Sequence, residues 1–319
     1  MKFLRDSTPF TQVLFTLIMI LMGGILVSMV GFLVCRIGLG ISFETLSGML
    51  SNVSEPANVS LLKFFQVLQS LGMFILPPLI IAYSLNDKPF QFLRLTARPA
   101  WRMLGVVCGV ILVSGPVIEW VSLLNQQLVL PSWLNWLEDW MRASEDQATE
   151  ITKAFLTTKS IGGLLGNLVI VAVLPAIGEE LLFRGVLQKL IQKMTGSSHW
   201  GIWITAIFFS ALHLQFFGFL PRMLLGALFG YLLVWTGSLW LPMIAHFINN
   251  AAGVIIFFVT GEGLEPDKAD VSLFNNTVFF FAVLSGVGVW MLLRYVYSKR
   301  EEKQMTEIQQ ANGGVSVEE

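Results

Sequence analysis

The chain has 319 residues, of which 55% are hydrophobic and 13% are charged, whereas an average globular domain is about 25% charged. This composition excludes an ordinary soluble domain and indicates a membrane protein. The formal net charge of −1 offers no basic surface for nucleic acid, so we expect no nucleic-acid partner. Cys35 and Cys108 both fall in apolar runs without the spacing of a metal or redox motif.

Long apolar stretches predict membrane-spanning helices, since about 20 apolar residues cross a bilayer as a helix. The first stretch, Phe10 to Cys35, is too long for a signal peptide and has no cleavage site, so we expect it to remain as a span. Pro77 and Pro78 predict a kink in the second span. The seven spans after the first are expected at about 64–85, 103–124, 161 to beyond 179, 201–219, 223–236, 239–259 and 274–293. The predicted fold is all-α and polytopic, with about eight transmembrane helices.

The segment 128–160 has a different character from these spans. Trp133, Trp136 and Trp140 recur at helical spacing with charged residues between them. Tryptophans of this kind are typical of a helix at headgroup level on a membrane surface. An ordinary loop helix packed on the protein accounts for the pattern equally well, and the sequence leaves both alternatives open.

Lysine and arginine bias predicts the topology. The basic pieces are the amino terminus, 86–102, 189–193 and 299–303, and the acidic pieces are 41–60, 138–150 and 262–270. Because these pieces alternate as eight crossings require, the positive-inside rule predicts that both termini are cytoplasmic. We expect one membrane domain over residues 1–298, in a bacterial plasma membrane, followed by a disordered cytoplasmic tail over 299–319.

Three charged residues stand close together in the apolar stretch 174–187: Glu179, Glu180 and Arg184. Each charge in a bilayer costs roughly 2.5–3.5 kcal/mol on insertion scales, so a functional role is the first hypothesis. Glu180 and Arg184 are spaced i,i+4, which predicts an ion pair on one helix face. Glu179 is rotated by about 100° from Glu180 and therefore points elsewhere. Pro175 removes one intrahelical hydrogen bond just before the site.

Two later spans also present polar residues at i,i+4 spacing. His213 follows Phe209 by four residues, and Asn250 follows His246 by four. Each residue alone is explained as packing or as a hydrogen bond between helices. Polar groups on three separate spans must face one another or water, and together they predict an internal polar chamber. His199 receives no role.

These residues carry a resemblance to a known family. The chain resembles the CPBP intramembrane proteases, which include the type II CAAX prenyl endopeptidases and bacteriocin-processing or immunity (Abi) relatives. The family pattern of EExxxR, FxxxH and HxxxN appears here, in order, as Glu179-Glu180 with Arg184, Phe209 with His213, and His246 with Asn250. The resemblance covers about 174–251, within an expected catalytic core of about 161–260.

The resemblance implies an endopeptidase that hydrolyses a peptide bond of a membrane-associated or lipidated protein or peptide. Carried over by motif, Glu179 activates a water molecule and His213 assists it. His246 and Asn250 stabilise the oxyanion, and an amide suits that role because it donates hydrogen bonds without charge.

The remaining motif residues are expected to be structural. Glu180 and Arg184 orient the helix, and Phe209 shapes the pocket wall. Glu179, His213 and His246 form a sufficient zinc set, but no HExxH motif is present and a glutamate-activated water needs no ion. A site without metal is favoured, and zinc is the alternative cofactor.

Two other classes of function remain open. A non-catalytic scaffold of the same family would bind another membrane protein, and the intact motifs argue against it. A proton-coupled transporter would predict internal repeats or paired broken helices, of which the sequence shows only Pro77-Pro78. The substrate and the oligomeric state are not specified by the residues.

Overall fold

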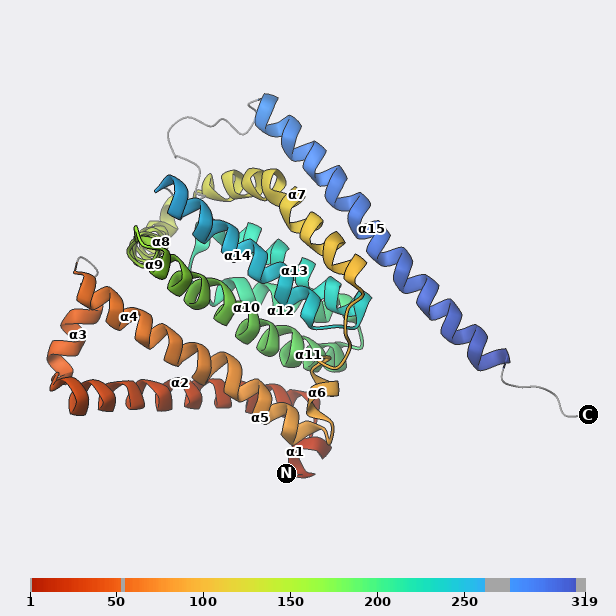
Figure 1. The fold of residues 1–319 in the computed structure, drawn as a ribbon, viewed down its shortest axis with the longest axis horizontal. Helices are drawn as coiled ribbons and strands as arrows, with labels where there is room; N and C mark the ends of the chain where they lie inside the picture. The colour runs from red at the N-terminus through yellow and green to blue at the C-terminus, as the bar shows by residue number, and fades with distance from the viewer. Residues whose placement is uncertain (1, 53–54, 262–275, 314–319) are drawn as a thin grey trace, which may run out of the picture.

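The computed structural model describes residues 2–52, 55–261 and 276–313. Every regular element among them is helical, which confirms the all-α polytopic fold (Figure 1). The first half contains α1 (Lys2–Asp6), α2 (Pro9–Leu39), α3 (Phe43–Ser51), α4 (Pro56–Gln69), η1 (Ser70–Ile75), α5 (Leu76–Leu85), α6 (Pro89–Phe92), α7 (Trp101–Gln126), η2 (Ser132–Leu134) and α8 (Asn135–Leu156). The second half contains α9 (Ile161–Asn167), η3 (Leu168–Val173), α10 (Leu174–Glu180), η4 (Leu181–Leu187), α11 (Gln188–Thr195), α12 (Ser198–Ala211), η5 (Phe216–Gly218), α13 (Phe219–Thr236), α14 (Trp240–Thr260) and α15 (Asn276–Gly313).

Within the described residues, seven helical stretches are long and apolar enough to span a membrane. They are Pro9–Leu39, Ala57–Leu85, Trp101–Gln126, Ile161–Thr195, Phe216–Thr236, Trp240–Thr260 and Thr277–Glu302. The remaining predicted span, 201–219, is the shorter helix α12, whose 14 residues extend about 21 Å. The chain then turns at Leu214, where φ is 54°, and returns into α13.

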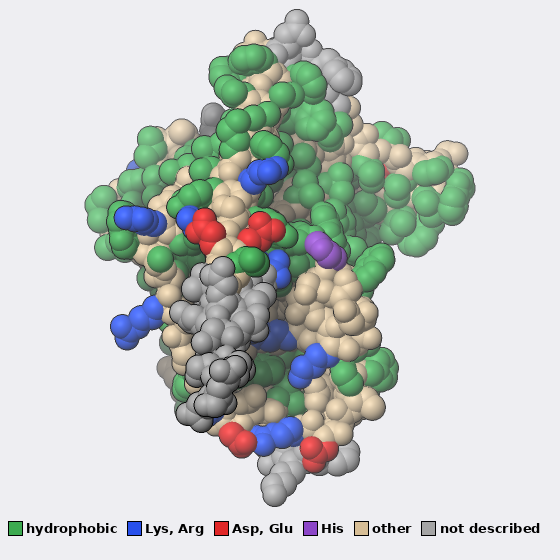
Figure 2. Space-filling model, turned by 90° about the vertical axis from the view of Figure 1, so that its right-hand side faces the viewer, with side chains coloured by type: hydrophobic (Ala, Val, Ile, Leu, Met, Phe, Trp, Pro, Cys, Tyr) green, Lys and Arg blue, Asp and Glu red, His purple; other side chains and the backbone are tan. Residues whose placement is uncertain are grey.

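The two ends of the described chain lie at the same end of the molecule. In Figure 1, α1, α6 and the C-terminal end of α11 lie together, at the opposite end of the molecule from α3 and α8. Helix α15 runs back toward the end that carries α1 and α6. Figure 2 views this end, where lysine and arginine side chains are spread among apolar ones. An even number of crossings agrees with this arrangement, and the cytoplasmic assignment of this end stays a prediction. The acidic piece 262–270 lies outside the described residues.

Prolines inside two spans are accommodated by π-helical turns. The turn η1 directly precedes the helix that contains Pro77 and Pro78, and η3 directly precedes the helix that contains Pro175. A proline lacks an N–H and crowds the carbonyl four residues earlier, and the wider i→i+5 turn takes up this misfit. Each span therefore continues through its prolines as one helical stretch.

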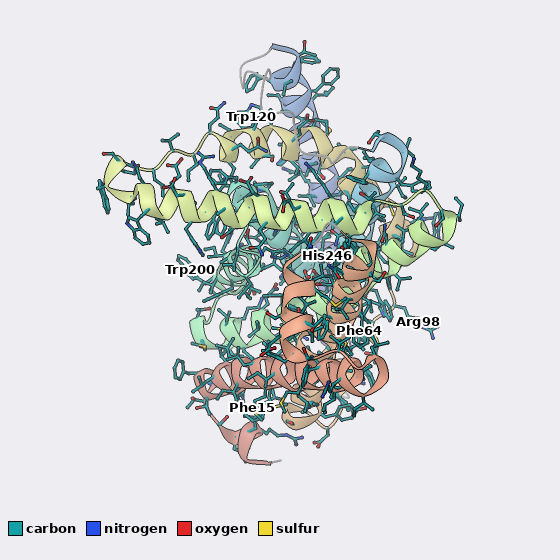
Figure 3. The ribbon with its side chains drawn as sticks, turned by 90° about the vertical axis from the view of Figure 1, so that its left-hand side faces the viewer. Phe15, Phe64, Arg98, Trp120, Trp200 and His246 are labelled. Atoms are coloured by element: carbon teal, nitrogen blue, oxygen red, sulfur yellow. The ribbon has the colours of Figure 1, made fainter. Side chains whose placement is uncertain are left out.

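Helix α8 lies across the ends of the spanning helices. It is seen nearly end-on in Figure 1 and runs across the molecule in Figure 3. Met141 packs inward, whereas Trp133, Trp136 and Trp140 remain 74%, 69% and 47% exposed. Helix α8 is therefore amphipathic: Trp136 is exposed, whereas the Trp140 ring lies 5.2 Å from the Phe216 ring of η5, and both alternatives for this helix stay open.

The short helix α1 is fastened to the body of the molecule. The Arg5 guanidinium donates to both carboxylate oxygens of Asp87, at 2.8 and 2.7 Å, and this holds the pKa of Asp87 below its usual range. Leu4 is buried, and the Gln12 amide donates to its carbonyl. At the other end of the chain, α15 continues as helix to Gly313, through most of the segment for which a disordered tail is predicted.

The core is centred on η4, whose seven residues are all buried. Leu182, Phe183 and Leu187 cluster with Phe209 of α12, and Leu181 and Val186 pack with α5 and α14. The span that carries the three charges is therefore enclosed by other helices, which is why charged side chains can be held there without contact with lipid.

Candidate active site

Glu180, Arg184 and His246 form a fully buried charged network. The ion pair predicted from i,i+4 spacing is present, with Nη1 of Arg184 2.8 Å from Oε1 of Glu180 and both side chains fully buried. Oε1 of Glu180 also lies 2.9 Å from Nδ1 of His246 on α14. One carboxylate oxygen therefore joins two helices. The sequence predicted the pair with Arg184 but gave no sign of the contact with His246, because that contact depends on how two spans pack.

The guanidinium of Arg184 is held by α13 and by aromatic rings. Its Nη2 donates to the carbonyl of Gly226 at 2.9 Å, and its centre lies 4.6 Å from the Phe209 ring and 5.4 Å from the Phe229 ring. A Cβ at Gly226 would lie 3.3 Å from Nη2 and 3.2 Å from Phe209, so glycine allows this close approach. Cation–π contacts of this kind contribute more when water is excluded.

His246 is fixed in orientation, and its second nitrogen faces the other glutamate. Because Nδ1 is directed at Glu180, the imidazole presents Nε2 to Oε2 of Glu179, at 3.9 Å. The ring is stacked on Phe229, with centroids 5.2 Å apart and planes inclined by 24°. Figure 3 shows His246 deep among the helices. The imidazole thus lies between two carboxylates from a single turn of α10.

Glu179 points away from Glu180, as its position on the helix predicts. Its Oε2 is buried and forms no hydrogen bond with a described residue. The preceding residue, Gly178, lies against η1, because an added Cβ there would be 2.8 Å from the Cβ of Phe74. Glu179 therefore has a carboxylate oxygen available for a further partner, in a region enclosed by α10, α14 and η1.

His213 lies apart from this pair. It follows the end of α12 by two residues, and its Nδ1 donates to the carbonyl of Phe209 at 2.7 Å, which leaves Nε2 as an acceptor. Within the described chain, no hydrogen bond or ion pair joins His213 to Glu179 or His246. The Phe209 ring lies between the two imidazoles, with centroids 5.1 Å from His213 and 6.0 Å from His246. His213 is exposed on the inner side of the turn between α12 and α13.

Arg222 on α13 is a second cation near the site, and sequence reasoning gave it no role. It donates to the side chain of Gln215 at 2.8 Å and acts electrostatically on both Glu179 and His213. The signal that could have identified Arg222 is a charged residue just inside an apolar stretch. The neighbouring loop is fixed by Asn125 of α7, which donates to the carbonyl of Phe216 at 2.9 Å.

Asn250 compensates for the proline in α10. Its amide donates to the carbonyl of Val171 at 3.1 Å, and its oxygen accepts from Asn249 at 3.2 Å. In an α-helix that carbonyl would receive the N–H of residue 175, but Pro175 has none. The structure therefore gives Asn250 a role in joining α14 to η3, and its predicted role at the oxyanion stays a prediction.

The predicted zinc ligands Glu179, His213 and His246 are not assembled. No three His, Cys, Asp or Glu side chains in the described ranges are placed to hold a metal ion. The physical reason is that His213 is held by the turn after α12, while Nδ1 of His246 is directed at Glu180. This donor arrangement does not fit a tetrahedral zinc site, and no step below passes through a metal.

An apolar pocket of about 550 Å³ is lined in part by residues that neighbour the site residues in the sequence. Ile177 and Leu181 on its wall flank the two glutamates, and Met243 precedes His246 by one turn. The pocket is lined by Leu79, Phe90, Leu95, Thr96, Ile177, Leu181, Trp240 and Met243. Its lining accepts apolar groups of a bound molecule next to the charged pair.

Comparison with known proteins agrees with this site. Residues 161–252 match the model of the Rce1-like family, described as type II CAAX prenyl endopeptidase Rce1-like. Over this segment, the chain is similar to the type II CAAX prenyl endopeptidases. The match includes Glu179, Phe209, His213, His246 and Asn250, and it ends just beyond the last motif residue.

A curated bacterial relative extends the comparison. The uncharacterized protein YpbD of Bacillus subtilis (strain 168) is 33% identical over 124 residues, which are 38% of this chain. This chain spans 58% of that relative's length. No solved structure matches the chain. The similarity of residues 161–252 to this family is one basis for the function proposed below.

Proposed function

We propose that this protein is an intramembrane endopeptidase of the CPBP family in which Glu179 activates water for the hydrolysis of a peptide bond. The observation that carries the proposal is the arrangement of one imidazole between two carboxylates inside a membrane-spanning bundle. Glu180 fixes the His246 ring from behind, and Glu179 stands 3.9 Å from its other nitrogen. An isolated ion pair for stability would not need the second glutamate, whose Oε2 has no hydrogen bond to a described residue.

The geometry allows a reaction in which each group has one role. A water molecule about 2.8 Å from both Oε2 of Glu179 and Nε2 of His246 would see them roughly 90° apart, which suits its two hydrogen-bonding directions. Glu179 takes a proton from this water as its oxygen attacks the carbonyl carbon. Glu179 then gives the proton to the departing amine, and the peptide bond breaks.

The developing negative charge on the substrate oxygen also needs a donor. His246 donates from Nδ1 to Glu180, so its Nε2 side faces the space in front of Glu179, where the oxyanion would form. His213, across the Phe209 ring, is assigned the assisting role that its motif implies, with Nε2 as an acceptor. The second N–H of the Asn250 amide adds a neutral donor. Glu180 and Arg184 hold these groups in position without touching the substrate.

The proposed substrate is a membrane-associated protein or peptide. The apolar pocket lined by Ile177, Leu181 and Met243 would take an apolar side chain or an attached lipid, and this is consistent with a lipidated substrate. The site lies within membrane-spanning helices, so the substrate reaches it from the bilayer or its surface. We propose a bacterial plasma membrane, with the end that carries α1 and α6 on the cytoplasmic side.

The test uses single alanine variants of Glu179, His213 and His246. Each should abolish cleavage while the protein remains folded and inserted in the membrane. His199→Ala is the matched control, since His199 bonds to Tyr231 at 2.8 Å away from the site and should leave cleavage intact. Comparison of membrane proteomes between wild type and Glu179→Ala should reveal uncleaved precursors that accumulate in the variant. Cleavage of such a precursor by Glu179→Ala at the wild-type rate would refute the proposal.

Metal dependence has a separate test. The proposed mechanism expects that chelator-treated protein cleaves the same precursor at the same rate as untreated protein. Elemental analysis of purified protein would check this directly, and loss of cleavage on chelation, restored by zinc, would show that the donor set rearranges in the active state.

A further inference from the structure

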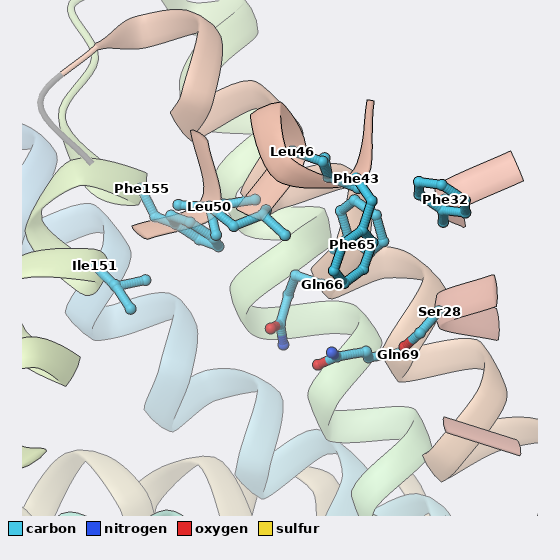
Figure 4. Close-up of a pocket in the computed structure, with 11 residues that line it drawn as sticks. Ser28, Phe32, Phe43, Leu46, Leu50, Phe65, Gln66, Gln69, Ile151 and Phe155 are labelled. Atoms are coloured by element: carbon cyan, nitrogen blue, oxygen red, sulfur yellow. The ribbon is translucent and has the colours of Figure 1, made fainter. Parts of the chain in front are cut away.

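A second cavity, of about 370 Å³, lies between the amino-terminal hairpin and α8, on the side of the molecule that carries α3 (Figure 4). None of the motif residues lines it. Its walls come from α2, α3, α4 and α8, and its lining residues are Ser28, Phe32, Phe43, Leu46, Leu50, Leu62, Phe65, Gln66, Gln69, Ile151 and Phe155. The cavity is large enough for a short stretch of peptide or part of a lipid chain.

The cavity combines an aromatic wall with a polar floor. Figure 4 shows the carboxamides of Gln66 and Gln69 next to each other on α4, below Phe43 and Phe65, with Ser28 of α2 beside Gln69. No hydrogen bond joins these three polar side chains to any residue that the structure describes. Gln66 and Gln69 are exposed, and Ser28 is partly exposed.

The polar floor lies at hydrocarbon depth. Gln66 and Gln69 are about 14 and 18 Å into the span Ala57–Leu85, and Ser28 is about 17 Å from the same end of Pro9–Leu39. Lipid tails cannot satisfy carboxamide and hydroxyl groups at this depth. Three polar groups within about 4 Å of the same depth on two helices, directed into one cavity, therefore indicate a hydrogen-bonding occupant.

The lining also restricts the charge of the occupant. Among the residues that the structure describes, no ionisable side chain lines the cavity. Lys63, one turn earlier on α4, donates instead to Asn167 at 2.7 Å. The occupant is therefore uncharged where it contacts the floor, which excludes a phosphate headgroup or a free carboxylate at that point.

Depth distinguishes a peptide from a lipid. The ester groups of a bilayer lipid lie near the interface, whereas the floor of this cavity lies in the hydrocarbon region. An unwound polypeptide segment carries unpaired N–H and C=O groups at every depth, and carboxamides both donate and accept. We infer that this cavity binds an uncharged, extended segment of the membrane-embedded polypeptide substrate. The inference rests on the proposed endopeptidase activity.

The cavity is connected to the reacting groups through one helix. Five residues beyond Gln69, about 8 Å along the axis, Phe74 of η1 contacts Gly178, the neighbour of Glu179. An extended chain covers that distance in about three residues. A segment bound at Gln66 and Gln69 would thus place a peptide bond a few residues away near Glu179.

The experiment uses full-length protein carrying Glu179→Gln, reconstituted in nanodiscs, so that binding is measured without cleavage. A photoreactive benzoylphenylalanine replaces Phe43, which is 68% exposed, and the control position is Leu76 on the outer face of α5, 50% exposed. The probes are a radiolabelled peptide with blocked ends, acetyl-(Leu-Ala)4-amide, and radiolabelled dioleoylglycerol. The inference expects peptide crosslinking at position 43 and much less at position 76.

The polar floor is tested with Gln66→Leu/Gln69→Leu against the matched control Gln91→Leu, which lies on α6 outside the cavity. Loss of two neutral hydrogen bonds should weaken peptide binding by roughly 5- to 30-fold, and the control should leave it unchanged. The inference would be overturned if position 43 crosslinked only to the lipid or to neither probe. It would also be overturned if the Gln66→Leu/Gln69→Leu variant crosslinked to the peptide as strongly as the protein that keeps both glutamines. The crosslinking comparison between positions 43 and 76 uses protein that keeps both glutamines, so its result does not depend on whether the double variant folds. Hydrolysis that persists in Glu179→Ala would instead refute the proposed function, so the two failures are distinguishable.

Discussion

Removal of the Glu180 carboxylate tests whether the buried network supports the fold. In Glu180→Ala, the fully buried guanidinium of Arg184 loses its partner at 2.8 Å, and His246 loses its partner at 2.9 Å. Arg184 retains its hydrogen bond to the Gly226 carbonyl, which compensates for little of a buried charge. Breaking a buried pair by removal of one partner costs about 3–5 kcal/mol. The loss at His246 overlaps with this cost, because both bonds use the same oxygen, and we therefore expect a total near that range.

The assay is unfolding of purified protein in mixed micelles by increasing SDS. The matched control is Glu302→Ala, which removes an equally short but exposed ion pair, 2.6 Å from Lys299, and should leave the midpoint unchanged because exposed pairs contribute little. The double variant Glu180→Leu/Arg184→Met should recover stability, since it removes both charges. If Glu180→Ala unfolded at the same SDS concentration as the wild type, the reasoning would be refuted. That result would mean that the buried charge of Arg184 is compensated without Glu180.

Three other changes separate catalysis from structure. Glu179→Gln should abolish hydrolysis in a peptide-release assay but leave the SDS midpoint unchanged, because Oε2 of Glu179 has no hydrogen bond to a described residue; a stable but active variant would contradict the assignment. Asn250→Leu should lower the free energy of unfolding by about 1 kcal/mol, since the part-buried Val171 carbonyl loses this hydrogen bond; unchanged stability would count against this role. Arg5 holds the pKa of Asp87 below its usual range, so this link should persist at neutral pH and be lost as the pH falls through that lowered value. Hydrogen exchange of α1 should then rise in acid, and Asp87→Asn should show the raised exchange already at pH 7.

The local part of the site follows from the sequence because it depends on helical spacing. Four-residue spacing on one helix is enough to place Glu180 beside Arg184, and a 100° rotation is enough to turn Glu179 away. Hydropathy likewise predicts the spans, since the cost of polar groups in lipid depends on composition along the chain. The short helix α12 was the exception, because the turn at Leu214 is not visible in hydropathy.

Contacts between helices were decided by tertiary structure. Nothing in the spacing of His246 reveals that its Nδ1 meets Glu180 rather than a substrate, or that His213 turns its ring toward the Phe209 carbonyl. The alternative zinc set, Glu179, His213 and His246, is likewise not brought together among the described residues. Residues on different spans share a site only when rotation and depth of each helix are known.

The amino-acid sequence by itself determined that charges would be buried in a membrane and which residues carry them, because these properties are local and additive along the chain. The packing of α10, α13 and α14 determined what the charges do to one another. One shared oxygen of Glu180 holds both Arg184 and His246, and this arrangement leaves Glu179 available. Its physical origin is the close approach of helices at Gly178 and Gly226, where no side chain keeps the backbones apart.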